Sequence, residues 1–225
     1  MTLWRDLKYL EEQGLLLRIR GGATSRQNVA GEMNFESKEI RAHEAKKIIA
    51  RLAVEAFVHE GDTLALEGGT TVAALVNELP ESRVSILTNS LPIALHVRKV
   101  RPGLAVQIAG GWLSPVSGNS TGPLALHMMD AWKPSVFFLS ATAFDAAWGP
   151  SDPNPMEIEV KRHLAAKAQK VVLLADEAKF GKRSHAVTLH PRHISAIVTN
   201  TQPPGDIMDL AARHNIQVVY PGLAH

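Results

Sequence analysis

The amino-acid sequence predicts an α/β protein whose central sheet is mostly parallel and carries helices on both faces. Short β-type runs alternate with helical patterns from Gly61 to the end of the 225-residue chain. The composition, with 45% hydrophobic and 20% charged residues, is typical of a globular protein with a sizeable core. Strands that alternate with helices form parallel sheets, because each crossover helix returns the chain to the same edge.

The predicted strands are short runs rich in Val, Ile and Leu. They are 63–66, 84–87, 104–109, 136–139, 171–175, 196–199 and 217–220. Helical patterns lie between most of them, at 72–78, 92–100, 124–132, 157–168 and 206–214. A further helix is predicted over 36–58, where apolar residues such as Ile40, Ile48 and Leu52 share one side.

The N-terminal segment predicts a helix followed by a β-hairpin. Leu3, Leu7 and Leu10 recur at helical spacing, a strand-like run covers 15–19, and a Gly-Gly turn follows at 21–22. Residues 1–26 hold five basic and three acidic side chains, whereas the rest of the chain is neutral. A helix with basic positions and a basic hairpin can lie in a DNA groove and contact phosphates.

This segment resembles the end of the winged helix-turn-helix of DeoR-type bacterial repressors, whose pattern T-h-R-R-D-L…G-h-h-x-R-x-G-G-A it follows over Thr2–Ala23. The resemblance implies that operator DNA is a partner. It also implies two helices before Thr2 that this sequence lacks, so an incomplete motif with poor operator binding on its own is expected. The residues it assigns to DNA contact are Thr2, Trp4, Arg5, Lys8, Arg18 and Arg20, with Trp4 standing where the family has a basic residue.

Polar and glycine residues follow several of the predicted strands. Glu67–Thr71 follows the first strand, Thr88–Ser90 the second, Gly110–Gly111 the third and Asp176–Gly181 a later one. Glycines let backbone N–H groups approach an anion, and a helix N-terminus adds positive potential. Each such turn alone can be an ordinary turn or helix cap. Together at one sheet edge, where ligands bind in open α/β sheets, they favour a polyanionic small ligand.

The order of these turns resembles the sensor domain of DeoR-type repressors over Lys46–Asn200. The family's D-S-G-T-T, T-N-S, G-G, V-K and D-x-S-K-F-G motifs have counterparts here in the same order. The resemblance implies a fold like ribose-5-phosphate isomerase and a phosphorylated sugar as effector. It places phosphate at Gly69, Thr70 and Thr71, and positive charge at Lys161 and Lys179. The effector residues it implies are Glu67, Gly69, Thr70, Thr71, Thr88, Asn89, Ser90, Gly110, Asp145, Lys161 and Lys179.

Two departures from the family pattern bear on the predicted pocket. Glu67 and Gly68 replace Asp and Ser, and Ser140–Asp145 lacks both glycines of the family's G-x-x-G-h-D motif. Added side-chain atoms there would crowd a ligand, although Asp145 keeps its place and could accept sugar hydroxyls. The segment 148–155 is rich in proline and is predicted to be a stiffened loop.

The domain organisation expected from these patterns has three parts. Residues 1–26 form a partial winged helix-turn-helix, 27–45 a linker and 46–225 an effector-sensing domain. No cofactor or metal site is indicated, because cysteine is absent and the ten histidines show no ligand spacing beyond His190 and His193. No apolar run reaches the roughly 20 residues of a membrane helix, and no leader opens the chain. We therefore expect a cytoplasmic protein without a membrane partner.

Two functions remain open at this level. The first is a repressor of carbohydrate genes that senses a sugar phosphate and forms a homodimer or homotetramer. The second is a sugar-phosphate isomerase of the same fold, for which Asp145, Glu157, Glu159 and Lys161 could supply acid–base groups. The winged-helix segment favours the repressor, since an isomerase has no use for it. Glu157 and Glu159 also point in different directions on a helix.

Overall fold

The computed structural model describes residues 6–7, 16–19, 22–25, 42–81 and 83–222. A seven-stranded, wholly parallel sheet forms the centre, in the order β14-β13-β11-β8-β3-β4-β5. Its strands are β3 (Thr63–Leu66), β4 (Ser85–Thr88), β5 (Ala105–Ile108), β8 (Val136–Ser140), β11 (Lys170–Leu174), β13 (Ala196–Val198) and β14 (Gln217–Val219). All seven predicted strands are confirmed to within a residue or two.

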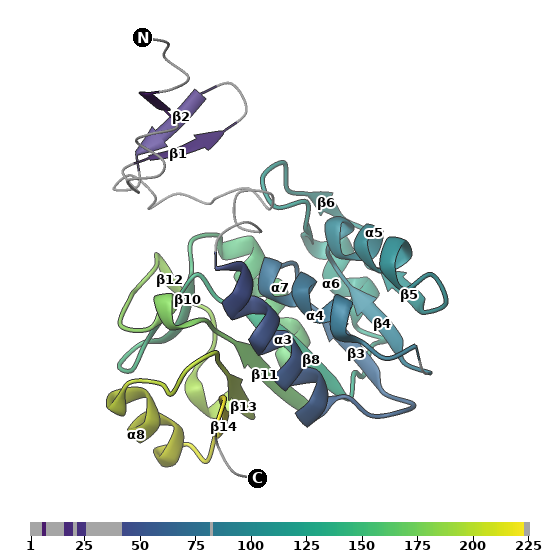
Figure 1. Cartoon of the computed structure of the whole chain (residues 1–225). Helices are drawn as coiled ribbons and strands as arrows, with labels where there is room; N and C mark the ends of the chain where they lie inside the picture. Colours follow the sequence, from purple (N-terminus) through teal and green to yellow (C-terminus); the bar gives the residue numbers. More distant parts are fainter. Residues whose placement is uncertain (1–5, 8–15, 20–21, 26–41, 82, 223–225) are drawn as a thin grey trace.

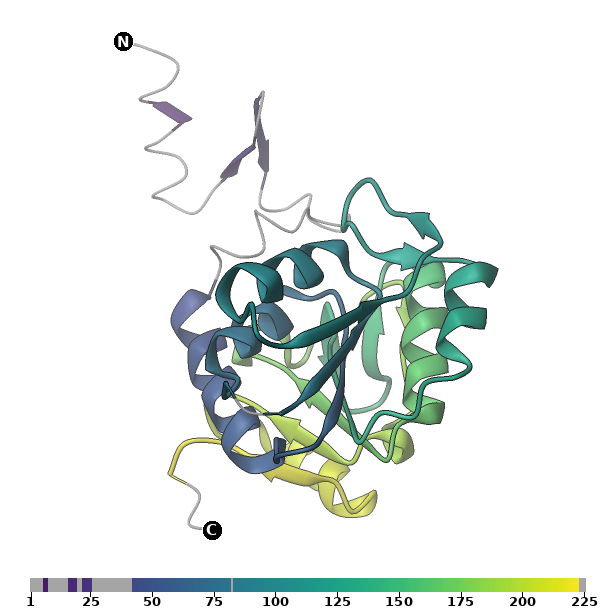
Figure 2. The ribbon, with the colours of Figure 1, turned by 90° about the vertical axis from the view of Figure 1, so that its right-hand side faces the viewer.

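Six helices cover the two faces of the sheet (Figure 1). They are α3 (His43–Phe57), α4 (Thr70–Glu78), α5 (Leu91–Val100), α6 (Pro123–Met129), α7 (Pro155–Lys167) and α8 (Gly205–Arg213). One core cluster joins the first three helices to one sheet face, and a second joins the last three to the other. Figure 2 shows the two helix layers on opposite sides of the sheet, blue on one side and green on the other.

The strands are buried on both faces because they carry continuous apolar runs. In β3, Leu64 and Leu66 join one core cluster while Ala65 between them joins the other. In β8, Phe138 packs on one side and Phe137 and Leu139 on the other, all with no exposed surface. Unbroken apolar strands of this kind are typical of parallel sheets covered by helices on both faces. The predicted α/β class is therefore confirmed.

Three small antiparallel units accompany the main sheet. The hairpin β1 (Leu16–Ile19) and β2 (Gly22–Ser25) corresponds to the strand and turn predicted near the N-terminus. The strands β6 (Trp112–Leu113) and β7 (Ser120–Thr121) form a second hairpin. A three-stranded unit contains β9 (Ala143–Asp145), β10 (Gly149–Asp152) and β12 (Ala186–Val187).

The sequence missed the three-stranded unit. The proline-rich segment 148–155 was predicted to be a loop, but β10 runs through it and includes Pro150. Proline removes one backbone donor, and a short strand in a small antiparallel unit can tolerate that loss. No helix among the described residues is long and apolar enough to cross a membrane.

The strand order reverses between β3 and β8. From β3 the chain proceeds outward through β4 to β5, then returns to place β8 on the other side of β3 and continues through β11 and β13 to β14. Open α/β sheets bind ligands beside the carboxyl ends of the strands at such a reversal. The ends of β3 and β8 are therefore where a site is expected from the fold.

Candidate functional site

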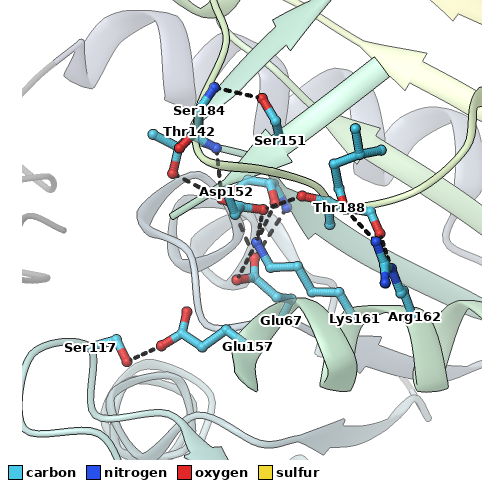
Figure 3. A network of polar contacts seen from close by, with 12 residues as sticks. Glu67, Ser117, Thr142, Ser151, Asp152, Glu157, Lys161, Arg162, Ser184 and Thr188 are labelled. Atoms are coloured by element: carbon cyan, nitrogen blue, oxygen red, sulfur yellow. Dashed lines mark hydrogen bonds and ion pairs between the residues drawn. The ribbon is translucent and has the colours of Figure 1, made fainter. Parts of the chain in front are cut away.

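A buried ionic cluster lies at the carboxyl ends of β3 and β8 (Figure 3). Lys161 of α7 extends its ammonium to Glu67 Oε1 at 3.3 Å, to Asp152 Oδ2 at 2.7 Å and to the Ser140 carbonyl oxygen at 2.9 Å. We call Glu67, Ser140, Asp152 and Lys161 the Lys161 cluster. All four residues are buried, and Lys161 is only 3% exposed. The three oxygens match the three donors of an ammonium group.

Each carboxylate of the Lys161 cluster has further donors. Glu67 Oε2 accepts a hydrogen bond from the Ser140 backbone N–H at 3.1 Å. Asp152 accepts from the Thr142 backbone and hydroxyl, each at 2.9 Å, and from the Thr188 hydroxyl at 2.7 Å. Buried charges need such partners to offset the cost of leaving water. The cluster therefore joins the ends of β3 and β8 to β10 and α7.

The pKa values of the two carboxyl groups are shifted in opposite directions. Burial raises the pKa of Glu67, and the positive charge of Lys161 offsets only part of that effect. Burial acts in the same direction on Asp152, but Lys161, with the hydroxyls of Thr188 and Thr142, holds its pKa below the ordinary value. The pKa of Lys161 is raised because both carboxylates outweigh its burial. Lys161 is consequently a permanent cation within the fold.

We expect Glu67→Gln and Asp152→Asn to alter the pH dependence of stability in opposite ways. A raised native pKa means that the wild type loses stability, relative to Glu67→Gln, as pH rises above the ordinary value of 4.5. A lowered native pKa means that its stability relative to Asp152→Asn is present above the ordinary value of 3.8 and is lost as pH falls through the native pKa. Urea titrations from about pH 3 to 8 measure both differences. A common direction for the two variants would contradict this assignment.

The N-terminus of α4 lies beside this cluster. Gly69 precedes the helix in extended conformation and provides no side-chain cap. A Cβ at Gly69 would lie 2.3 Å from Ser140 Oγ, so a larger residue here would displace the Ser140 hydroxyl. Thr70 and Thr71, the first two residues of α4, are buried. An uncapped helix N-terminus carries partial positive charge and backbone donors that suit an anion.

Thr88 and Ser90 are used within the fold. The Thr88 hydroxyl donates to the Leu66 carbonyl at 2.7 Å and accepts from the Ser90 N–H at 3.0 Å. Ser90 caps α5, because its hydroxyl accepts from the Ile93 N–H. In this structure Ser90 is therefore a helix cap, one of the roles that the sequence left open for these turns.

Two buried asparagines face the same region and carry acceptors with no hydrogen-bond donor. Asn89 donates to the Ser120 carbonyl at 3.0 Å, but its Oδ1 has no partner. Asn119 Oδ1 is likewise without a partner, and both side chains are 2% exposed. A Cβ on Gly68 would lie 1.8 Å from Asn119 Oδ1. Because Gly68 has no side chain where the family pattern has serine, the Asn119 side chain can pack against its backbone.

Lys179 makes weaker ion pairs than Lys161, the other predicted lysine. It ends a short 3-10 turn, η2 (Glu177–Lys179), directly after β11, and its nearest carboxylate oxygen, on Asp176, is 4.0 Å away. Burial lowers its pKa, and the charges of Asp152 and Lys161 also act on it. The ammonium of Lys179 therefore interacts electrostatically with the Lys161 cluster without being one of its members.

Asp145 belongs to a different group of contacts. It lies on β9 and accepts from the Ala147 and Trp148 backbone N–H groups and from Arg183 at 3.1 Å. The Arg183 hydrogen bond holds its pKa low, and the guanidinium lies 4.9 Å from the centre of the Trp148 ring. The structure thus places Asp145 in the three-stranded unit, outside the Lys161 cluster.

The remaining predicted residues are placed as follows. Gly110 follows β5 and donates its N–H to Met128 Sδ at 3.2 Å. Arg18 lies on β1 opposite Ala23, whereas Thr2, Trp4, Arg5, Lys8 and Arg20 lie outside the described residues. Sequence reasoning missed Asp152 and Asn119. Asp152 lies in the segment that was predicted to be a loop, so nothing in the sequence indicated that its carboxylate would be buried.

The candidate isomerase groups are not assembled into an acid–base pair. Glu157 accepts a hydrogen bond from Ser117, whereas Glu159 is exposed (Figure 3 shows the first contact). A hollow of about 390 Å³ lies elsewhere, between α7 and the segment Val187–His193, and its Arg162 already donates to two backbone carbonyls. The polar sheet edge therefore remains the better candidate site.

A parallel sheet with a polar, lysine-bearing carboxyl edge defines a small-molecule-binding α/β domain, here preceded by a β-hairpin. Residues 41–201 match the family model described as the DeoR C terminal sensor domain, and residues 1–29 match the DeoR-like helix-turn-helix domain. The chain belongs to the DeoR family of DNA-binding transcriptional regulators. The resemblance predicted from the sequence motifs is confirmed.

Three relatives are transcriptional regulators by name. The HTH-type transcriptional regulator GlpR of Haloferax volcanii is 32% identical, over 88% of this chain and 77% of that protein. The lactose phosphotransferase system repressor of Staphylococcus epidermidis is 30% identical, over 89% and 80%. The glycerol-3-phosphate regulon repressor of Escherichia coli is 27% identical, over 96% and 85%. These names support a regulator rather than an enzyme.

Solved structures are similar to this chain at low sequence identity. The translation initiation factor eIF-2B of Pyrococcus horikoshii OT3 has a TM-score of 0.51 and 14% identity, covering 71% of this chain and 63% of that one. Ribose 5 phosphate isomerase A of Neisseria gonorrhoeae has a TM-score of 0.45 and 18% identity, covering 61% and 53%. At these identities the likeness concerns the fold alone.

Proposed function

We propose that this protein represses a regulon of carbohydrate metabolism and that a phosphorylated sugar is its effector. Residues 1–26 would contact operator DNA, 27–45 would act as the linker, and 46–225 would sense the effector in the cytoplasm. The names of two relatives, which refer to a glycerol-3-phosphate regulon and a lactose phosphotransferase system, support this class of ligand.

The uncapped N-terminus of α4 at the strand-order reversal is the observation that carries the proposal. The first turn of α4 contains no acidic residue that would compete with an anion. Phosphate groups bind at helix N-termini through backbone donors and the helix dipole. Lys179 would add a positive charge from the end of β11. Thr71 and the glycines at 68 and 69 would then lie around the phosphate.

The two asparagine acceptors support the sugar part of the ligand. Buried polar atoms usually have a hydrogen-bond partner, and Asn89 Oδ1 and Asn119 Oδ1 have none. Sugar hydroxyls are donors that would satisfy both. Because Lys161 already has three oxygen partners, its role in the proposed site is to fix the ends of β3 and β8.

We expect a phosphorylated sugar to raise the melting temperature and Lys179→Gln to weaken that effect. A hundredfold excess over the dissociation constant stabilises the native state by about 2.7 kcal/mol, which corresponds to roughly 5–10 °C for a chain of this size. Loss of one charge-assisted contact would weaken binding by about tenfold or more. Differential scanning fluorimetry with glycerol 3-phosphate and several hexose phosphates measures the shift.

The matched control is Lys182→Gln, which removes an exposed lysine three residues farther along the same segment. It should leave the shift unchanged, and unphosphorylated sugars should produce none. The proposal fails if no sugar phosphate gives a shift. The assignment of Lys179 fails if both lysine variants respond like the wild type.

A further inference from the structure

One continuous part of the chain is without charge. Although 20% of all residues are charged, residues 103–129 contain no Asp, Glu, Lys or Arg. This stretch forms β5, the hairpin of β6 and β7, and α6. Figure 1 shows β5 and β6 at the same end of the molecule, beside α5. Two strands of this neutral stretch, β5 and β6, therefore lie at one end of the molecule (Figure 1).

The strand β5 is an edge of the main sheet. Among the described residues it pairs only with β4 and ends the strand order, so its other side presents backbone donors and acceptors. Ala105, Gln107 and Ile108 are exposed. Natural edge strands are usually protected by lysine, proline, bulges or a covering segment, because a bare edge recruits another strand. No lysine or proline lies within β5.

Large apolar side chains are exposed beside this edge. Trp112 and Leu113 of β6 are 67% and 53% exposed, and Leu124 at the start of α6 is 59% exposed. The Trp112 ring lies over the backbone of Gly122, where a Cβ would approach within 3.1 Å. Exposed apolar side chains that gather on one surface mark interaction sites on soluble proteins. We call β5, β6 and the start of α6 the neutral edge.

We propose that the neutral edge is where a second copy of this chain binds, with β5 of the two copies paired antiparallel about a two-fold axis. In a two-fold contact each patch meets its own copy, so a patch charged with one sign would oppose like charges, whereas a neutral patch opposes none. Identical strands related by a two-fold axis perpendicular to the sheet run antiparallel, a stable pairing. The neutral edge itself offers no Asp, Glu, Lys or Arg side chain to an acidic, basic or nucleic-acid partner.

Size-exclusion chromatography with light scattering tests the proposal through Ala105→Lys and Ile108→Lys. The wild-type 24.4 kDa chain should run as a dimer or a higher even assembly. Each lysine would place like charges across the paired strands and weaken the two-fold contact by at least tenfold. The assembly should fall by one step, from dimer to monomer or from tetramer to dimer. Gln217→Lys, at an exposed position of the opposite edge strand β14, should not change it.

Cross-linking gives a second readout that does not depend on weakening the contact. Because the chain has no cysteine, Gln107→Cys introduces a single thiol on β5. A short bis-maleimide should join two chains of this variant but not two chains of Gln217→Cys. The proposal is overturned if the wild type is monomeric at tens of micromolar. It is also overturned if the lysine variants keep the wild-type assembly or if both cysteine variants cross-link equally.

Discussion

Replacing Lys161 with methionine is expected to lower the free energy of unfolding by about 3–5 kcal/mol. The substitution keeps most of the side-chain length but removes the ammonium that contacts Glu67, Asp152 and the Ser140 carbonyl. Two buried carboxylates would then remain with no cation at ion-pair distance. Breaking a buried ion pair is costly because the remaining charge is neither hydrated nor neutralised. The melting temperature should fall by roughly 6–20 °C.

Lys167→Met on the same helix is the matched control. Lys167 pairs with Asp130 at 3.0 Å, but Asp130 is half exposed and water screens this pair. Exposed ion pairs contribute about 0–1 kcal/mol, so this variant should stay close to the wild type. Chemical denaturation followed by circular dichroism compares the two. If Lys161→Met costs no more than Lys167→Met, the Lys161 cluster does not stabilise the fold as described.

Adding Asp152→Asn to Lys161→Met separates charge from packing. The double variant has one buried carboxylate fewer, while the asparagine oxygen can still accept from Thr142 and its amide group can donate to the Thr188 hydroxyl. If the loss comes from uncompensated charge, the double variant should be more stable than Lys161→Met alone. If the loss comes from packing at position 161, the second substitution should make it worse.

The main sheet could be predicted because its strands follow a local rule. Runs such as Val136–Ser140 are apolar at every position but the last, and helices between such runs require parallel pairing. Parallel pairing also places the residues after each strand at one edge. The sequence therefore indicated that Glu67, Thr88 and Lys179 follow strands at a common edge, without any knowledge of the strand order.

The contacts within the candidate site could not be predicted in the same way. Asp152 makes the shortest contact with Lys161 and lies on β10. This strand is held by pairing with β9 and β12, and such pairing leaves no periodic pattern of apolar residues in the sequence. Asn119 reaches Gly68 across about fifty residues of sequence. The burial of the tryptophans could not be predicted either, because Trp132 is buried whereas Trp112 is exposed. These outcomes depend on long-range packing rather than on local pattern.

Gly111→Ala is expected to destabilise the protein by about 2–5 kcal/mol, whereas Gly110→Ala should cost under about 1 kcal/mol. Gly111 has a φ of +141°, and an added Cβ would lie 2.6 Å from the Thr121 carbonyl oxygen, which is backbone and cannot swing away. Gly110 has no such φ, and its Cβ would meet only Met128 Sδ at 3.5 Å. The sequence shows two adjacent glycines but does not reveal which one the fold requires.

Measuring ligand response in the same pair of variants distinguishes a structural glycine from a ligand-lining one. Gly110→Ala should keep the wild-type urea midpoint and, if Gly110 lines the proposed effector pocket, should reduce the melting-temperature shift caused by a sugar phosphate. Gly111→Ala should lower the midpoint in the absence of any ligand, since its strain lies between the β6–β7 hairpin and the start of α6. Equal midpoints for the two variants would show that the backbone at Gly111 relaxes around a methyl group, and that the close contact with Thr121 does not fix this hairpin.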